Sequence, residues 1–188
     1  MTNLSTLLIA VIIAAIVVLW FVLHAYNRLV AMRNNVRKAW SDVDVQLTFR
    51  HDLVPNLVES VKGYMGHERE TLEEVARARS AAMNTGVDIA TRAVAEMALG
   101  SAVGNLFVTA ERYPELKASQ NFLLLQEQLT TTENRIAFAR QHYNESVRQF
   151  NTLIAEFPWN LMAQRFGYSA EKMFAAEPPD RATVQMAS

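Results

Sequence analysis

The chain has 188 residues and a formal net charge of −1 at pH 7, so its bulk charge shows no preference for nucleic acid. It contains no cysteine, which excludes disulfides, thiolate metal sites and cysteine nucleophiles. Glycine and proline are scarce, with 6 and 5 residues, and long helices depend on that scarcity.

An apolar segment without any charged residue covers residues 4–23. About 20 apolar residues in a helix cross the roughly 30 Å hydrocarbon core of a bilayer. No basic residue precedes the segment and no small-residue cleavage site follows it, so we expect an uncleaved anchor and not a signal peptide. No face of the segment is polar, which argues against a helix of a soluble core. The predicted membrane span includes Leu4, Leu8, Ile12, Ile16, Leu19, Trp20 and Leu23.

Basic residues dominate the stretch that follows the apolar segment, and the first acidic residue is Asp42. The basic residues are Arg28, Arg33, Arg37 and Lys38. Because positive charge stays on the cytoplasmic side of a membrane, we expect the N-terminus outside and the bulk of the chain in the cytoplasm. Trp20 and Tyr26 suit the aromatic belt at the inner interface.

A long helix is predicted over residues 25–65, because its seam residues recur at alternating spacings of three and four. The seam consists of Tyr26, Leu29, Arg33, Val36, Trp40, Val43, Leu47, Arg50, Val54, Leu57, Val61 and Tyr64. An arginine in a seam costs stability unless it is paired, so Arg33 and Arg50 need acidic or carbonyl partners. Pro55 predicts a kink near residues 51–54, unless Asp52 caps a new helix there.

Shorter helices are predicted in the middle of the chain, over residues 68–83 and 89–111, with a turn at 84–86 between them. The second is rich in alanine and carries Gly100 and Gly104, whose spacing would allow close approach of a neighbouring helix.

A second long helix is predicted over residues 122–157, again with alternating three-four spacing. Its stripe consists of Phe122, Leu125, Leu129, Thr132, Ile136, Ala139, Tyr143, Ser146 or Val147, Phe150, and Leu153 or Ile154. One more short helix is expected over 161–166. We therefore predict an all-α fold, in which an N-terminal transmembrane helix is followed by an antiparallel long-helix bundle of four to five helices. The expected domains are an anchor at 1–24, the bundle at 25–174 and a polar tail at 175–188.

Motifs that carry chemistry are absent from this sequence. His24, His51, His67 and His142 lack the spacing of a metalloprotease site, and no helix carries the Glu-x-x-His motif of a di-iron bundle. There is no glycine-rich phosphate loop, and no histidine is placed beside a candidate serine nucleophile. We expect a non-enzymatic protein without a metal, a cofactor or a small-molecule substrate.

Polar side chains lie beside the seams of both long helices. This predicted polar ladder consists of Arg33, Asp44, Arg50, Asp52, Asn56, Glu133, Arg140, Asn144 and Asn151. Paired polar groups between helices fix their register, which is one interpretation. The other is a surface for a partner or for a second copy of the chain, and a catalytic role has the least support.

Several of these stretches resemble the LemA family of bacterial membrane proteins. The resemblance is carried by Tyr26-Asn27-Arg28-Leu29-Val30, Ala39-Trp40-Ser41-Asp42-Val43-Asp44, Arg50-His51-Asp52-Leu53-Val54-Pro55-Asn56, Tyr113-Pro114-Glu115-Leu116-Lys117 and Thr132-Glu133-Asn134-Arg135-Ile136. It implies a single-pass protein of the bacterial inner membrane with a cytoplasmic helical bundle. It implies no established activity, and it supplies no catalytic residues.

Two functional hypotheses follow. The first is a membrane-anchored scaffold or membrane-organising protein that self-associates, with the lipid bilayer and further copies of the chain as its partners. The second is an adaptor that presents its bundle to a membrane protease or an envelope-stress system, docking through the polar ladder or the exposed face of residues 68–79.

Overall fold

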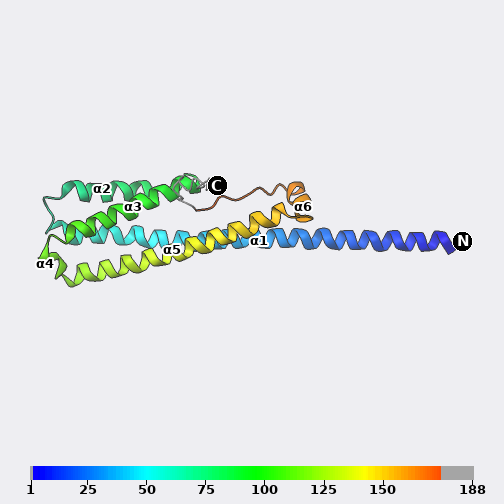
Figure 1. The fold of residues 1–188 in the computed structure, drawn as a ribbon, viewed down its shortest axis with the longest axis horizontal. Helices are drawn as coiled ribbons and strands as arrows, with labels where there is room; N and C mark the ends of the chain where they lie inside the picture. Colours follow the sequence, from blue (N-terminus) through cyan, green and yellow to red (C-terminus); the bar gives the residue numbers. More distant parts are fainter. Residues whose placement is uncertain (1, 175–188) are drawn as a thin grey trace, which may run out of the picture. The chain divides into compact units, whose positions relative to one another are not determined.

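The computed structural model describes residues 2–174, and within them all regular secondary structure is helical. In chain order the helices are α1 (Thr2–Lys62), α2 (Arg69–Ala82), α3 (Ile89–Ala110), α4 (Pro114–Lys117), α5 (Gln120–Ala155) and α6 (Trp159–Arg165) (Figure 1). The predicted all-α fold with an apolar N-terminal helix is confirmed. The predicted polar tail at 175–188 lies outside the described residues.

The helices belong to two compact units. The first unit, which we call the anchor unit, comprises Met1–Ala39 and Glu145–Glu171. The second, the bundle unit, comprises Trp40–Asn144 and Lys172–Ser188. Both long helices, α1 and α5, therefore contribute residues to each unit.

The bundle unit is an up-down-up-down arrangement of four helical segments, from α1, α2, α3 and α5 (Figure 1). Within it α1 and α5 are antiparallel, because Trp40 packs on Tyr143 with ring centroids 5.3 Å apart and Arg50 bonds to Glu133 further along. Its core is mainly aliphatic and includes Leu53, Val54, Leu57, Val61, Val75, Leu99, Val103, Leu106, Leu116, Phe122, Leu125 and Leu129. The three-four spacing puts these side chains on one face of each helix, and burial of that face stabilises the bundle.

The predicted seam of α1 is buried or half-buried from Leu29 to Val61. Its two end residues, Tyr26 and Tyr64, are exposed. Tyr64 comes after the last helical residue of α1, so helical spacing does not direct its side chain toward the core. Tyr26 packs at the surface against Phe166, with ring centroids 5.1 Å apart. The predicted stripe of α5 is buried, apart from the alternative position Ile154, which is half-buried.

Pro55 does not interrupt α1, and Asp52 is an exposed residue within that helix and not a cap. Proline has no backbone N–H, so the carbonyl of His51 loses the donor that a regular helix supplies from four residues later. The structure provides another donor, because Nε of Arg79 in α2 bonds to the His51 carbonyl at 2.8 Å.

The alanine-rich α3 packs into the core, where Leu99, Ala102, Val103 and Leu106 are buried. Asp88 caps its first turn by accepting hydrogen bonds from Ala90 N and Thr91 Oγ1. The predicted role of Gly100 and Gly104 in close helix approach does not hold. A Cβ at Gly100 would be in ordinary contact with Arg50, 3.5 Å away, and one at Gly104 would meet open space.

The anchor unit has a small core, in which Leu29, Leu153 and Ala163 are buried beneath Met32, Ile154, Trp159, Met162 and Tyr168. Residues 4–20 of α1 are exposed on all sides. Both α1 and α3 have a stretch long and apolar enough to span a bilayer, but the stretch in α3 is partly buried in protein. The apolar surface left without protein cover is therefore that of the N-terminal part of α1.

Candidate functional site

A cluster of buried charges joins three helices of the bundle unit. Arg50 of α1 is 2% exposed, and its Nη1 donates to Glu133 Oε1 of α5 at 2.7 Å. Its Nη2 donates to the backbone carbonyl of Glu96 in α3 at 3.0 Å and also to the Glu96 carboxylate. His51 Nε2 lies 3.0 Å from Glu96 Oε1. The seam position that requires a partner thus has two carboxylates and a carbonyl around it.

Glu96 is held ionised although it is only 3% exposed. Burial raises the pKa of its carboxyl, but the hydrogen bond from His51 and the charge and hydrogen bonds of Arg50 outweigh burial, so the net pKa lies below its ordinary value. Its charge is therefore compensated within the cluster. This mutual compensation is typical of a group that orders neighbouring helices, because an unpaired buried charge is costly.

A second buried arginine extends the cluster along α3. Arg92 forms an ion pair with Asp44 of α1, and its guanidinium lies 5.3 Å from the ring centroid of Trp40. Arg92 and Glu96 are four residues apart, so both project toward α1 from one face of α3.

A cavity of about 430 Å³ adjoins the cluster and is lined by Arg50, Glu96, Glu133 and Arg140 among others. Arg140 lies 5.0 Å over the ring of Phe174, and its pKa is lowered by burial and by repulsion from Arg50. Along this wall Arg50 is already paired with Glu96 and with Glu133. The arrangement supports helix ordering better than it supports acid–base chemistry.

The residues of the predicted polar ladder reach different partners. Arg50 and Glu133 join α1 to α5 directly, whereas Asp44 binds Arg92 of α3. Asn144 and Asn151 hold the backbone after α6, at Phe174 and Glu171, and Arg33 lies 3.6 Å from the Glu171 carboxylate. Asp52 and Asn56 are exposed.

Sequence reasoning missed Arg92, Glu96 and Arg79 as partners of α1. The signal for the first two was present, because Arg92 and Glu96 are charges at i and i+4 within an otherwise apolar helix. No pattern in the sequence pointed to Arg79, because its role depends on the carbonyl that Pro55 leaves free.

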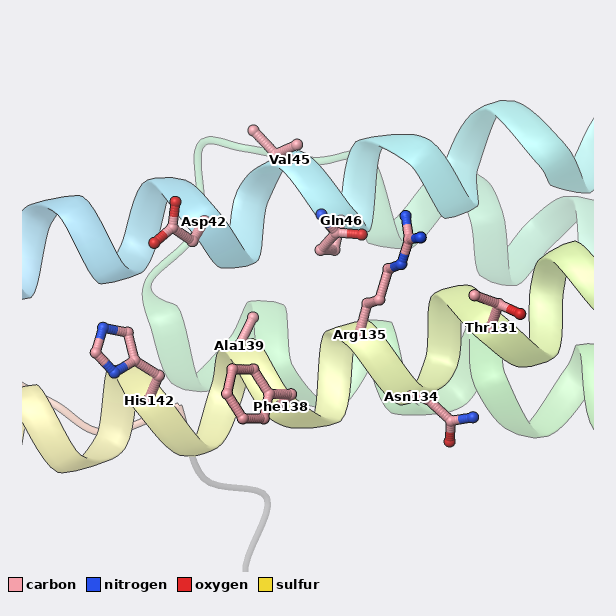
Figure 2. Close-up of a pocket in the computed structure, with 9 residues that line it drawn as sticks. All are labelled: Asp42, Val45, Gln46, Thr131, Asn134, Arg135, Phe138, Ala139 and His142. Atoms are coloured by element: carbon pink, nitrogen blue, oxygen red, sulfur yellow. The ribbon is translucent and has the colours of Figure 1, made fainter.

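The second candidate feature is an open groove on the outer side of α1 and α5, which we call the α1/α5 groove (Figure 2). It has a volume of about 540 Å³ and is lined by Asp42, Val45, Gln46, Thr131, Asn134, Arg135, Phe138, Ala139 and His142. Phe138 is 74% exposed and Val45 is exposed as well. A neighbouring hollow shares Val45, Gln46 and Arg135 and adds Phe49, so the apolar surface continues along α1.

Charges of both signs border this groove. Figure 2 shows Arg135 of α5 extending toward α1, with Asp42 on α1 further along the groove. Asp52 lines the neighbouring hollow. Among residues 2–174 these three side chains form no ion pair with one another or with other residues. The groove therefore combines exposed apolar side chains with unpaired charges at its border. Protein–protein interfaces have the same composition, with an apolar centre and a polar periphery.

In the part of the chain that the structure describes, no three histidine or acidic side chains converge as metal ligands. The His51–Glu96 pair is too closely engaged with Arg50 to leave an open coordination position.

Comparison with known proteins agrees with the motif-bearing stretches. Residues 39–187 match the sequence profile of the LemA family, so the match begins after the apolar segment. The chain is similar to Protein LemA of Metamycoplasma hominis, with 28% identity over 84% of this chain and 72% of the relative. It is 22% identical to Magnetosome protein MamQ of Magnetospirillum gryphiswaldense and to Magnetosome protein MamQ 1 of Paramagnetospirillum magneticum. Those two alignments cover 83% of this chain and 66% of each relative, slightly less than two thirds of their length.

Proposed function

Because the chain belongs to the LemA family, we propose that it is a non-enzymatic scaffold, anchored in a membrane and assembled from several copies. The observation that carries this proposal is the α1/α5 groove, an exposed apolar surface bordered by unpaired charges of both signs. Two relatives are named as magnetosome proteins, which agrees with a role at a membrane.

Anchoring rests on the N-terminal part of α1. Apart from Ser5 and Thr6, its residues 4–20 are apolar, and all of them are exposed, a surface that is stable in lipid and costly in water. In the proposed topology the chain crosses the bilayer once, and the basic residues that follow the span favour a cytoplasmic location for its bulk. In a bacterium this membrane is the inner one.

The absence of an enzymatic role is supported by the state of the buried charges. Arg50 pairs with both Glu96 and Glu133, and His51 is engaged with Glu96. A general base must be within reach of a substrate proton, and a nucleophile needs an adjacent base. The buried cluster instead fixes the positions of α1, α3 and α5 relative to one another. This arrangement maintains the shape of the α1/α5 groove.

A second copy is the occupant that the groove fits best. A twofold interface uses the same patch on both copies, so a self-complementary patch must carry its own opposite charges. Arg135 on one copy would face Asp42 or Asp52 on the other, while Phe138 and Val45 would lose contact with water. Ala10, Ala14 and Ala15 in the span would allow close contact between the two membrane helices.

Cross-linking in native membranes tests this interface. The chain contains no cysteine, so Phe138→Cys places a single thiol in the groove. We expect oxidation to give a covalent dimer, because the two copies of Phe138 lie near the centre of a twofold contact. The matched control is Glu74→Cys on the exposed face of α2, which should remain monomeric.

The same pair of variants separates the two hypotheses about partners. A dimer from Phe138→Cys alone supports self-association. Equal cross-linking of both variants would indicate random collision, and a cross-link only to a different membrane protein would favour the adaptor role. Either result would contradict the scaffold.

A further inference from the structure

The turn and short helix after α5 expose an unusual amount of apolar surface. Phe157 is 79% exposed, Leu161 is 53% exposed, and Phe166 is also exposed. Phe157 lies in the turn that precedes α6, and Leu161 lies in the first turn of α6. Within the anchor unit, α6 packs on the protein core through Ala163, Met162 and Trp159, and Leu161 lies off that face.

This segment packs against the end of the predicted membrane span. The ring of Trp159 lies 6.0 Å from that of Phe21 and 6.1 Å from that of His24. The guanidinium of Arg28 lies 5.6 Å from the same ring. Because the predicted span ends at Leu23, these contacts fix α6 beside the residues that leave the bilayer.

The chemistry of the segment suits that depth. Tryptophan and other aromatic side chains favour the boundary between headgroups and acyl chains, and cationic side chains beside them attract anionic headgroups. Arg28 flanks Trp159, and Arg165 ends α6 on the side that carries Leu161. The exposed surface therefore lies on a segment that packs beside the end of the apolar span, and it is bordered by positive charge.

We propose that residues 157–166 are a second membrane contact, seated on the bilayer surface with Phe157 and Leu161 in the headgroup–acyl boundary. The occupant of this apolar surface is lipid with anionic headgroups. The inference rests on the proposed anchoring by α1, since Trp159 reaches the bilayer surface only if the span ends near Leu23. The contact of residues 157–166 with lipid would orient the anchor unit on the membrane, because two points of attachment restrict its movement more than one.

Quenching by spin-labelled lipids tests the proposal with the full chain in vesicles of phosphatidylcholine and phosphatidylglycerol. Single cysteines at Leu161→Cys and, separately, Leu8→Cys carry an environment-sensitive fluorophore. We expect the label at 161 to be quenched more by a nitroxide near the headgroup than by one near the chain end. The label at 8, inside the span, should show the opposite preference.

The two labels distinguish the possible failures. If the label at 8 is quenched and the label at 161 is not, the anchor is retained and the second contact is refuted. If neither label is quenched, the anchoring itself is wrong.

The role of the basic border is measured in the same vesicles. Arg165→Gln in the Leu161→Cys chain should weaken quenching when phosphatidylglycerol is present and leave it unchanged in phosphatidylcholine alone. Equal quenching with and without Arg165 in both lipids would overturn the assignment of an anionic lipid.

Discussion

Arg50 is the residue at which the polar contacts of the bundle unit converge. Its guanidinium forms ion pairs with the carboxylate of Glu96 in α3 and with that of Glu133 in α5. It occupies a seam position where a leucine would otherwise pack. A buried pair of this kind is costly to desolvate and costly to break, so its value lies in selecting one arrangement of helices. Seam spacing predicted that Arg50 needs a partner, but it did not identify Glu96.

Arg50→Ala should destabilise the chain by about 3 kcal/mol or more, because Glu96 would keep its buried charge without its main counterion. The measurement is urea unfolding of the full chain in detergent, followed by far-ultraviolet circular dichroism. Arg148→Ala is the matched control, since Arg148 also pairs with a glutamate but lies at the surface, and it should leave the unfolding curve unchanged. A loss below about 0.5 kcal/mol for Arg50→Ala would refute the buried pair.

Glu96 also makes stability depend on pH. A carboxyl whose pKa is lower in the folded chain stabilises the fold above its ordinary pKa and loses that contribution as pH falls through the folded value. The free energy of unfolding should therefore decline as pH drops below about 4.5, the ordinary glutamate value. Glu96→Gln should be less stable at neutral pH and should show a flatter decline in acid.

A surface group titrates in a similar range and needs its own control. Hydrogen bonds from Arg148 and Gln149 lower the pKa of Glu145 to about 2. Because this pair is exposed, added salt should screen its effect, whereas the effect of Glu96 should persist. The free energy of unfolding could instead lose its decline in acid when salt is added, or decline equally in Glu96→Gln. Either result would assign the pH dependence to groups other than Glu96.

At the scale of the element, α1 shows where sequence patterns succeed and where they fail. The three-four spacing predicted its buried face because that spacing repeats on one side of a helix. The expected disturbance at Pro55 depends on a lost hydrogen bond, and Arg79 of α2 replaces its donor. Such a replacement comes from another helix, so local sequence does not reveal it.

The contact between Arg79 and the His51 carbonyl can be tested with a double-mutant cycle. Arg79→Ala should cost about 1.5 kcal/mol in the natural chain, since it removes a charge-assisted hydrogen bond to a carbonyl without another donor. In Pro55→Ala the new N–H at position 55 can bond to His51, so the same substitution should cost less. The four urea-unfolding curves give the coupling energy, and equal losses in both backgrounds would contradict this explanation.

The α1/α5 groove was not predicted, although its components are visible in the sequence. Val45, Phe49 and Phe138 are apolar residues that lie off the predicted stripes of their helices. Off-stripe apolar residues are common on protein surfaces, so one of them alone indicates little. They become a candidate site because α1 and α5 pack side by side within the bundle unit and bring them together.

At the scale of the whole molecule, the all-α fold and the apolar anchor were predictable because both depend on periodicity and composition, which are local properties. The partners of Arg50, the support of Pro55 and the outer groove depend on which helices become neighbours. For example, α3 supplies Glu96 and Arg92 to the buried cluster. Contacts between helices therefore could not be predicted from the sequence pattern, which describes each helix separately.

We propose that the anchored bundle assembles with copies of itself through the α1/α5 groove. The most direct test is the mass of the full chain in bilayer discs, measured by particle imaging for the natural chain and for Arg135→Glu. Because Arg135 is exposed, its replacement should not change the circular dichroism spectrum. The substitution would place a carboxylate opposite Asp42 or Asp52 of the second copy, so we predict discs with two or more copies of the natural chain and single copies of Arg135→Glu. Single copies of both proteins at every protein-to-lipid ratio would contradict the scaffold.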